Sequence, residues 1–218
     1  MSTAEALDLD RVPNPPLRNG DVMSRDEFER RYADMPGTKA ELIDGVVYVA
    51  SPVFKDHSKP HTWILAWLGT FDDISEGYEV LTEHSVRLDA DTEVQPDALV
   101  RKLEGGRSAY SPEGFVDGAP ELTVEVSVSS VSRDLHSKLR AYQDAGVQEY
   151  VVWRVRDGEL DWFQLKDGSY VKLDSDAQGV IESRVVPGLR LWVPALLAGR
   201  TVAVSDHLLG RIEARDEG

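Results

Sequence analysis

The sequence has 218 residues, with 39 acidic against 24 basic side chains and a formal net charge of -15. This surplus of negative charge repels other polyanions over long range, which argues against a nucleic-acid partner, and it favours solubility. There is no cysteine, so disulfides are excluded, and no apolar run is long enough to cross a membrane. We therefore expect a soluble, cytoplasmic protein with no membrane contact.

The length suits a single well-filled core, and no linker rich in proline, glycine or serine divides the chain. The first residues contain several prolines and little apolar periodicity, which is typical of a loose tail. We expect a flexible tail over residues 1–20, one domain over residues 21–198 and an extension over residues 199–218.

Cap and turn residues divide the first hundred residues into helices and strands. Ser24 and Glu27 form a capping box, which predicts a helix that ends near residue 33. The pair Asp44-Gly45 predicts a tight turn in a hairpin over residues 41–49. Pro60 suits a first helical turn, and the spacing of the apolar residues after it predicts a core-facing helix. Strands are expected over residues 78–88 and 94–100.

The second half begins with a strand over residues 122–128, in which aliphatic and polar residues alternate. A helix is expected from Ser132 as its N-cap to Gly146 as its terminator. Three short strands joined by Asp-Gly turns then predict an antiparallel meander, and residues 202–214 are expected to end in a helix. The fold class is α+β: a mixed sheet flanked by helices, with an antiparallel meander in the C-terminal half.

Two acidic residues lie inside apolar strand segments. Asp97 follows Pro96, and Glu125 shares the polar face of its strand with Thr123 and Ser127. Carboxylates on adjacent strands can converge on one divalent cation such as Mg²⁺ or Ca²⁺, which offsets their mutual repulsion. Glu41, at the start of the first hairpin, could join them. The alternative for each acid is solvation or pairing with a nearby basic side chain.

The acids and their neighbours form five motifs in order along the chain. They are Glu41-Leu-Ile-Asp-Gly45, Gln95-Pro-Asp97, Ala119-Pro-Glu-Leu-Thr-Val-Glu125, Asp134-Leu-His-Ser-Lys138 and Tyr142-Gln-Asp-Ala-Gly-Val-Gln-Glu-Tyr-Val151. From about residue 24 to residue 194 the chain resembles the Uma-two restriction-endonuclease family of the PD-(D/E)xK nuclease superfamily. The resemblance implies a restriction-endonuclease-like fold and Mg²⁺- or Mn²⁺-dependent cleavage of DNA. It also implies a metal held by Asp97, Glu125 and the Val126 carbonyl, and a catalytic set of Glu41, Asp97, Glu125 and Lys138.

One position departs from the superfamily pattern. The pattern has a lysine two residues after the glutamate, where this sequence has Ser127. The family resemblance points to Lys138 on the following helix as its replacement, and we expect its ammonium group within direct or one-water reach of Glu125. The alternative is a surface ion pair between Asp134 and Lys138, which are spaced i,i+4.

Basic side chains near Lys138 offer the one local attraction for DNA. Arg133, His136 and Arg140 form a basic patch that is a candidate contact for the DNA backbone, or an ordinary exposed helix face. His57 and His61, at the start of the aromatic helix, could contact a phosphate or a metal, but solvated histidines there need no function. A homodimer is a further expectation, from unpaired strand edges.

Two other functions are also compatible with the sequence. The same fold could be a non-catalytic module that binds a basic protein partner through its acidic surface, and the net charge favours this. A glycoside hydrolase could use paired carboxylates, but the tryptophans that it would need for sugar binding are predicted in the core.

Overall fold

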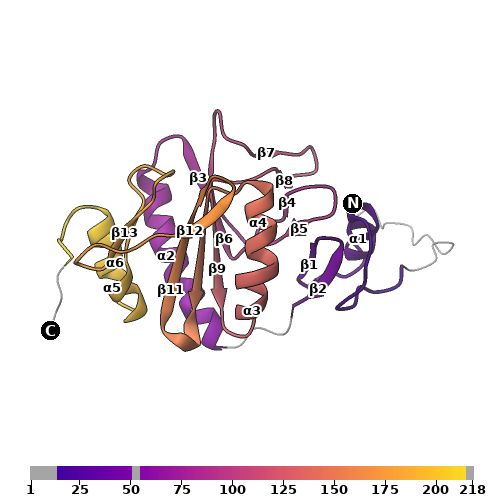
Figure 1. The fold of residues 1–218 in the computed structure, drawn as a ribbon, viewed down its shortest axis with the longest axis horizontal. Helices are drawn as coiled ribbons and strands as arrows, with labels where there is room; N and C mark the ends of the chain where they lie inside the picture. The colour runs from indigo at the N-terminus through magenta and orange to yellow at the C-terminus, as the bar shows by residue number, and fades with distance from the viewer. Residues whose placement is uncertain (1–13, 51–54, 215–218) are drawn as a thin grey trace, which may run out of the picture.

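A computed structural model describes residues 14–50 and 55–214. Its N-terminal part is a six-stranded sheet in the order β2-β1-β5-β4-β8-β7 (Figure 1). The strands are β1 (Ala40–Ile43), β2 (Val46–Val49), β4 (Val86–Arg87), β5 (Glu93–Val94), β7 (Ala109–Tyr110) and β8 (Val116–Asp117), and helix α1 (Arg25–Tyr32) packs beside them. The Ser24 hydroxyl accepts a hydrogen bond from the Glu27 N–H, as the capping box predicts.

A second six-stranded sheet, in the order β12-β11-β10-β9-β6-β3, forms the centre of the molecule. Its strands are β3 (Tyr78–Thr82), β6 (Ala98–Lys102), β9 (Leu122–Ser127), β10 (Glu149–Arg154), β11 (Glu159–Lys166) and β12 (Ser169–Lys172), with a 3-10 turn (Val155–Asp157) between β10 and β11. Strands β9 and β10 pair in parallel, whereas the other pairs are antiparallel. The meander over β10–β12 is therefore confirmed.

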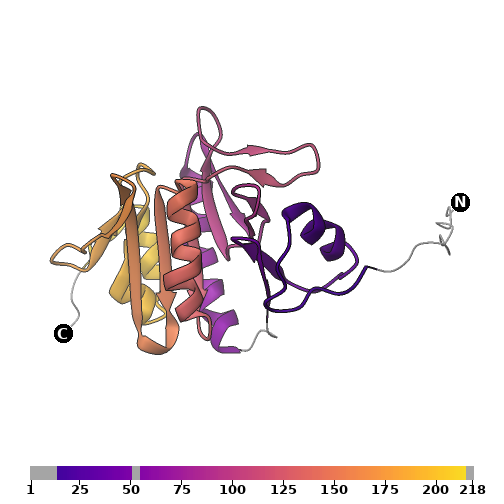
Figure 2. The same cartoon turned by 45° about the vertical axis from the view of Figure 1, so that its right-hand side comes forward.

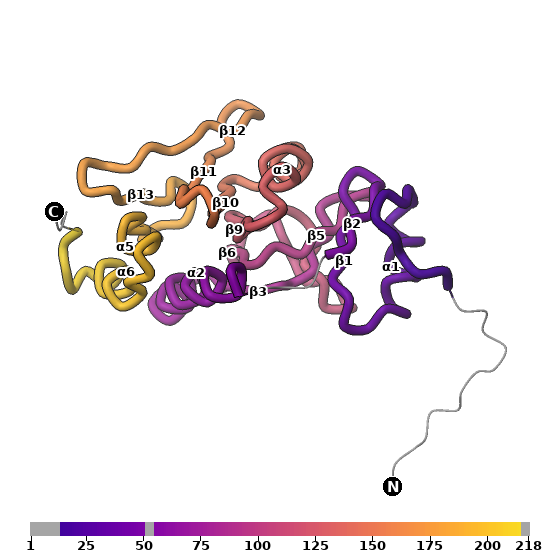
Figure 3. The backbone as a smooth tube through the Cα atoms, turned by 90° about the horizontal axis from the view of Figure 1, so that it is seen from below, coloured from indigo at the N-terminus to yellow at the C-terminus, as the bar shows by residue number. Residues whose placement is uncertain are grey.

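The parallel pair needs a crossover, which consists of α3 (Val131–Arg133), one π-helical turn (Asp134–Lys138) and α4 (Leu139–Ala145). This crossover covers one face of the central sheet, and helix α2 (Lys55–Ile74) lies on the other face with α5 (Val193–Leu197) and α6 (Thr201–Leu208) (Figures 2 and 3). A small hairpin, β13 (Val180–Glu182) with β14 (Arg190–Trp192), adjoins α5 and α6. The predicted α+β class is confirmed.

Apolar side chains fill both faces of the central sheet. On the α2 side, Ile64, Trp67, Leu68 and Phe71 pack against Val124, Val126 and Trp162, with the indoles of Trp67 and Trp162 edge to face. On the crossover side, Tyr142 and Tyr150 form the centre of a second cluster, which continues into the N-terminal sheet. The aromatic stripe of α2 is core, as its spacing indicates.

Several boundaries differ from the sequence-based expectations. Residues 78–88 and 94–100 each divide between the two sheets, because a chain that leaves one sheet for the other must break its strand. Pro60 lies inside α2, and Ser130 rather than Ser132 precedes the first turn of the crossover. Packing also extends beyond the expected domain limits, since Leu17 near the N-terminus and Leu208 in α6 are both buried.

The link from β5 to β6 positions the candidate site, because it carries the chain from the N-terminal sheet into the central sheet. Asp97 lies in this link, one residue before β6. Over the part of the chain that the structure describes, no helix is long and apolar enough to cross a membrane.

Candidate active site

Asp97 and Glu125 lie side by side on neighbouring strands. Strands β6 and β9 pair Ala98 with Val124, so the same antiparallel register, continued by one residue, brings Asp97 opposite Glu125. The Val126 N–H donates a hydrogen bond to Asp97 Oδ2 at 2.7 Å, which fixes the aspartate at the end of its strand. The two residues are only 3% and 5% exposed.

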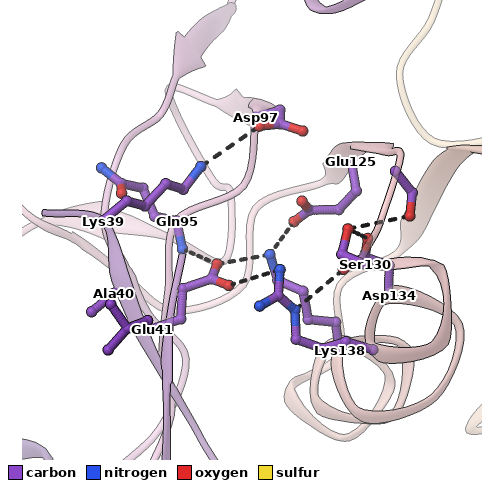
Figure 4. Close-up of polar contacts among 12 residues, drawn as sticks. Lys39, Ala40, Glu41, Gln95, Asp97, Glu125, Ser130, Asp134 and Lys138 are labelled. Atoms are coloured by element: carbon purple, nitrogen blue, oxygen red, sulfur yellow. Dashed lines mark hydrogen bonds and ion pairs between the residues drawn. The ribbon is translucent and has the colours of Figure 1, made fainter. Parts of the chain in front are cut away.

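Lys138 lies between two carboxylates (Figure 4). Its Nζ is 2.5 Å from Glu125 Oε1 and 2.7 Å from Glu41 Oε1, and the residue is 1% exposed. The Tyr142 hydroxyl donates to the same Glu125 oxygen at 3.0 Å. The alternative of a solvated surface pair with Asp134 is wrong, because the π-helical turn buries Asp134 and Lys138 together.

The space where the superfamily pattern has a lysine is occupied by a hydroxyl network. Ser127 is fully buried, and its Oγ lies 3.3 Å from Ser130 Oγ. Ser130 in turn donates to Asp134 Oδ2 at 2.5 Å. Lys138 thus brings to Glu125, from the helix, the positive charge that Ser127 cannot supply.

Glu41 reaches the site from β1, across the boundary between the sheets. The backbone N–H of Gln95 donates to Glu41 Oε1 at 2.8 Å, and Arg133 NH2 lies 4.0 Å from Oε2. Burial raises the pKa of Glu41, but the positive charges of Lys138 and Arg133 outweigh it and hold the pKa below its usual value. Glu41 is therefore an ionised partner for Lys138.

Asp97 has two basic side chains beside its carboxylate. Lys39 Nζ is 3.6 Å from Oδ1, and His57 Nε2 is 3.4 Å from Oδ2. Burial raises the pKa of Asp97, yet the hydrogen bond with His57 and the Lys39 ammonium group hold it well below the usual range. The carboxylate is thus ionised and available as an oxygen ligand.

Glu125 has the opposite electrostatic balance. Burial raises its pKa to about 8, and the negative charges of Asp97, Asp134 and Glu41 add to that rise, against the opposing effect of Lys138. Burial and the neighbouring acids therefore disfavour the ionised form of Glu125. A cation bound beside Glu125 and Asp97 would favour the ionised form.

The predicted basic patch divides into two parts. Arg133 is half-buried, lies 3.6 Å from Asp134 Oδ1 and stacks over the Tyr48 ring, so it belongs to the carboxylate site. His136 and Arg140 are exposed on the crossover helix. Only these two remain free to face a large ligand.

Sequence reasoning missed several side chains around the acids. Lys39 and Tyr142 contact them, and Glu83 approaches from the β3–β4 link. Potential metal-binding atoms of His61, Glu83 and Asp97 all lie within 4.8 Å of one another. The i,i+4 spacing of His57 and His61 was a usable signal, since two histidines one helical turn apart are a recurring metal-binding pattern.

The architecture matches that of a solved structure. A crystal structure of a "putative nuclease belonging to DUF820" from Anabaena variabilis ATCC 29413 superposes with a TM-score of 0.65, over 81% of this chain and 98% of that chain, at 14% sequence identity. The match is one of fold, and it identifies the mixed sheets and flanking helices as restriction-endonuclease-like. No curated protein sequence matches this chain.

The fold is restriction-endonuclease-like. The sequence model of the Uma2 family, described as "Putative restriction endonuclease", matches residues 25–196. The chain belongs to this family, which confirms the resemblance found in its motifs.

Proposed function

We propose that the protein is a Mg²⁺-dependent endonuclease that hydrolyses DNA phosphodiester bonds, with Mn²⁺ able to replace Mg²⁺. The observation that carries the proposal is the burial of Lys138 between Glu41 and Glu125, with Asp97 on the neighbouring strand. Burying a lysine among acids at the junction of two sheets costs desolvation energy. Such a buried charged group is more typical of a functional site than of a purely stabilising contact.

The side chains at the junction suit a hard divalent cation. Asp97 and Glu125 offer carboxylate oxygens, the ligands that Mg²⁺ prefers, and the Val126 carbonyl is the proposed third ligand. Burial, together with the negative charges of Asp97, Asp134 and Glu41, raises the pKa of Glu125, and a cation bound beside it would favour its ionised form. When bound, such an ion supplies Lewis acidity and lowers the pKa of a coordinated water.

The chain's own groups have distinct tasks in the proposed reaction. The Val126 N–H holds Asp97 in place, and the Tyr142 hydroxyl holds Glu125. The Lys138 ammonium group donates hydrogen bonds from a fixed position beside Glu125, where it can orient the attacking water or stabilise the charge that develops on the phosphate. Burial lowers the pKa of Lys138, but the negative charges of Glu125 and Glu41 outweigh it and raise the pKa above its usual value, so that Lys138 stays protonated.

A DNA-cleavage assay tests the proposal. The wild-type protein should nick a supercoiled plasmid in Mg²⁺ or Mn²⁺ and not in EDTA. Asp97→Asn, Glu125→Gln and Lys138→Ala should each lower the rate about a hundredfold or more, since each removes a group that acts in the reaction. Lys102→Ala changes an exposed lysine of β6 and is the matched control.

Metal binding separates the functions of these residues. Mg²⁺ should raise the melting temperature of the wild type by mass action, and Asp97→Asn should abolish this rise, while Lys138→Ala should retain it. Wild-type protein without cleavage in any metal, or an Asp97→Asn variant with full activity, would refute the nuclease proposal.

A non-catalytic module is the second candidate, and the net charge of -15 favours it. Such a protein would bind a basic partner through its acidic surface and leave DNA intact. Absence of both cleavage and Mg²⁺ binding in the same preparation is the result that would select this alternative.

A further inference from the structure

Asp97 has a second set of neighbours on the side of helix α2. His57 and His61 lie one helical turn apart near the start of α2, with ring centroids 5.6 Å from each other. His57 Nε2 is 3.4 Å from Asp97 Oδ2, and His61 Nε2 is 3.3 Å from the Asp97 carbonyl oxygen. The proposed nuclease reaction uses neither histidine.

Glu83 completes this group from the link between β3 and β4. Its backbone N–H donates to the Asp97 carbonyl at 3.3 Å, and its own carbonyl accepts from Gln95 Nε2 at 2.6 Å. Its φ of 48° lies in the left-handed region, which is uncommon for a residue other than glycine. Because these bonds hold the loop against the β5–β6 link, the Glu83 carboxylate stays close to His61 and Asp97.

The distances among these side chains suit one metal ion. A ligand atom from each of His61, Glu83 and Asp97 lies within 4.8 Å of the other two. Ligand atoms bound to one ion at about 2.1 Å are separated by about 3 to 4 Å, so small side-chain rotations would close the group. Glu83 is exposed and Asp97 is buried, which leaves an entry route from solvent to a fixed inner ligand.

We propose that His61, Glu83 and Asp97 form a binding site for a divalent transition-metal ion, with His57 beside it as a fourth donor. Imidazole nitrogen suits Zn²⁺, Fe²⁺ and Ni²⁺, and Mn²⁺ follows these ions in its affinity for sites with nitrogen and oxygen ligands, whereas Mg²⁺ prefers oxygen ligands alone. The site is therefore distinct in metal preference from the all-oxygen site at Asp97 and Glu125. Asp97 belongs to both sets of candidate ligands.

The histidine site and the group around Lys138 use different side chains. Lys138 contacts Glu125 and Glu41, whereas His61 and the backbone N–H of Glu83 contact the Asp97 carbonyl oxygen. The two groups thus have separate ligands except for Asp97. Loss of a histidine should leave the Glu125 side intact, and loss of Glu125 should leave the histidine side intact.

Mn²⁺ binding in the presence of excess Mg²⁺ isolates the proposed site, because Mg²⁺ occupies oxygen ligands and leaves imidazole sites open. Calorimetry with MnCl₂ should show one Mg²⁺-resistant Mn²⁺ per wild-type chain. His61→Ala and Glu83→Gln should each weaken it about tenfold or more, by analogy with losses at other metal sites. Pulsed electron paramagnetic resonance should show ¹⁴N coupling from imidazole, reduced in His61→Ala.

Two controls keep this test separate from folding and from the nuclease proposal. His84 is next to Glu83 in the sequence, but its ring contacts the Gly114 carbonyl. His84→Ala should therefore bind Mn²⁺ as the wild type does. Glu125→Gln should also retain the Mg²⁺-resistant ion. Melting curves in EDTA report folding for each variant.

The outcomes distinguish the two proposals. A wild-type protein with no Mg²⁺-resistant Mn²⁺, or a folded His61→Ala variant with wild-type Mn²⁺ affinity and ¹⁴N coupling, would overturn the site. Retained Mn²⁺ binding without DNA cleavage would support the site and refute the nuclease proposal.

Discussion

Lys138 shows how a single buried cation can hold two parts of a fold together. Its ammonium group joins Glu41 of the N-terminal sheet to Glu125 of the central sheet, at 2.7 and 2.5 Å. The two carboxylates belong to strands far apart in sequence, β1 and β9. Without Lys138, two buried carboxylates would remain close together with one half-buried arginine as their nearest positive charge.

Replacement of this lysine by an apolar side chain of similar length should therefore destabilise the metal-free protein. We expect Lys138→Met to lower the free energy of unfolding by about 3 to 5 kcal/mol, the usual cost of removing one partner of a buried ion pair. Mg²⁺ should recover more stability in the variant than in the wild type, since it restores positive charge. Urea unfolding in EDTA and in Mg²⁺ measures both, with Lys102→Met as the control. A loss below about 1 kcal/mol would show that the pair contributes little.

Glu93, in β5, is a further buried acid, and its main electrostatic neighbours are Glu29 and Arg87. It is 2% exposed, and neither carboxylate oxygen has a hydrogen-bond partner among the described residues. Burial, with the negative charge of Glu29 beside it, raises the pKa of Glu93 to about 8. In the unfolded chain the same carboxyl ionises near 4.5. The stability that the neutral carboxyl supports is fully present below pH 4.5 and is lost as the pH rises to about 8.

Glu93→Gln should remove this pH dependence, because the amide is neutral at every pH and can donate to Glu29. We expect the variant to be more stable than the wild type by about 1 to 3 kcal/mol near pH 8, and similar to it near pH 4. Urea unfolding at both pH values gives the comparison, and Glu76→Gln, at an exposed position, is the control. Parallel stability curves for wild type and variant would contradict the assignment.

Among the helices and strands, local sequence signals predicted those features that depend only on neighbouring residues, such as a helix start or a tight turn. The capping box at Ser24 and the Asp44-Gly45 turn, both of whose residues have positive φ, produced the expected helix and hairpin. The division of residues 78–88 between two sheets could not be predicted, because it depends on which distant strands each half pairs with. Alternation of apolar residues looks the same on both sides of such a break.

For the candidate site too, local sequence signals identified some residues and missed those that depend on tertiary packing. Asp97, Glu125 and Glu41 were found from strand context and motif resemblance, because an acid in an apolar strand is conspicuous in sequence. Lys39 and Tyr142 were missed, since their contacts with the acids arise only from tertiary packing. The π-helical turn was also missed, because hydrogen-bond spacing within a helix leaves no clear mark in composition.

Helix α6 was expected to belong to an extension, yet it packs on α2 and completes the core. Leu208 is 5% exposed, whereas Val202 on the same helix is 73% exposed. Leu208→Ala should lower the free energy of unfolding by about 2 to 5 kcal/mol through lost burial and a cavity. Val202→Ala should change it by about 0.5 kcal/mol or less. Equal effects in a urea-unfolding experiment would mean that α6 is not part of the cooperative unit.

The whole molecule has a net charge of -15, whereas the proposed substrate, DNA, is itself a polyanion. Long-range repulsion of DNA is inevitable at low salt, so attraction must come from a few short-range contacts. Arg133 forms ion pairs with Glu41 and Asp134. The exposed His136 and Arg140 of the predicted basic patch are therefore the candidate phosphate contacts. Binding should therefore be weak, with few counterions released.

The number of phosphate contacts can be counted from the salt dependence of binding. In an Asp97→Asn background, in which we expect no cleavage, Arg140→Ala should weaken affinity for a short DNA duplex about equally across sequences. It should also reduce the slope of log K against log salt by about 1. The reason is that each neutralised phosphate releases about one counterion. Lys166→Ala, an exposed lysine at the end of β11, should leave the slope unchanged. Fluorescence anisotropy over a salt series measures both variants. Slopes that are identical for Arg140→Ala and Lys166→Ala would place the DNA contact elsewhere, and an affinity independent of salt would favour a basic protein as the partner of this acidic surface.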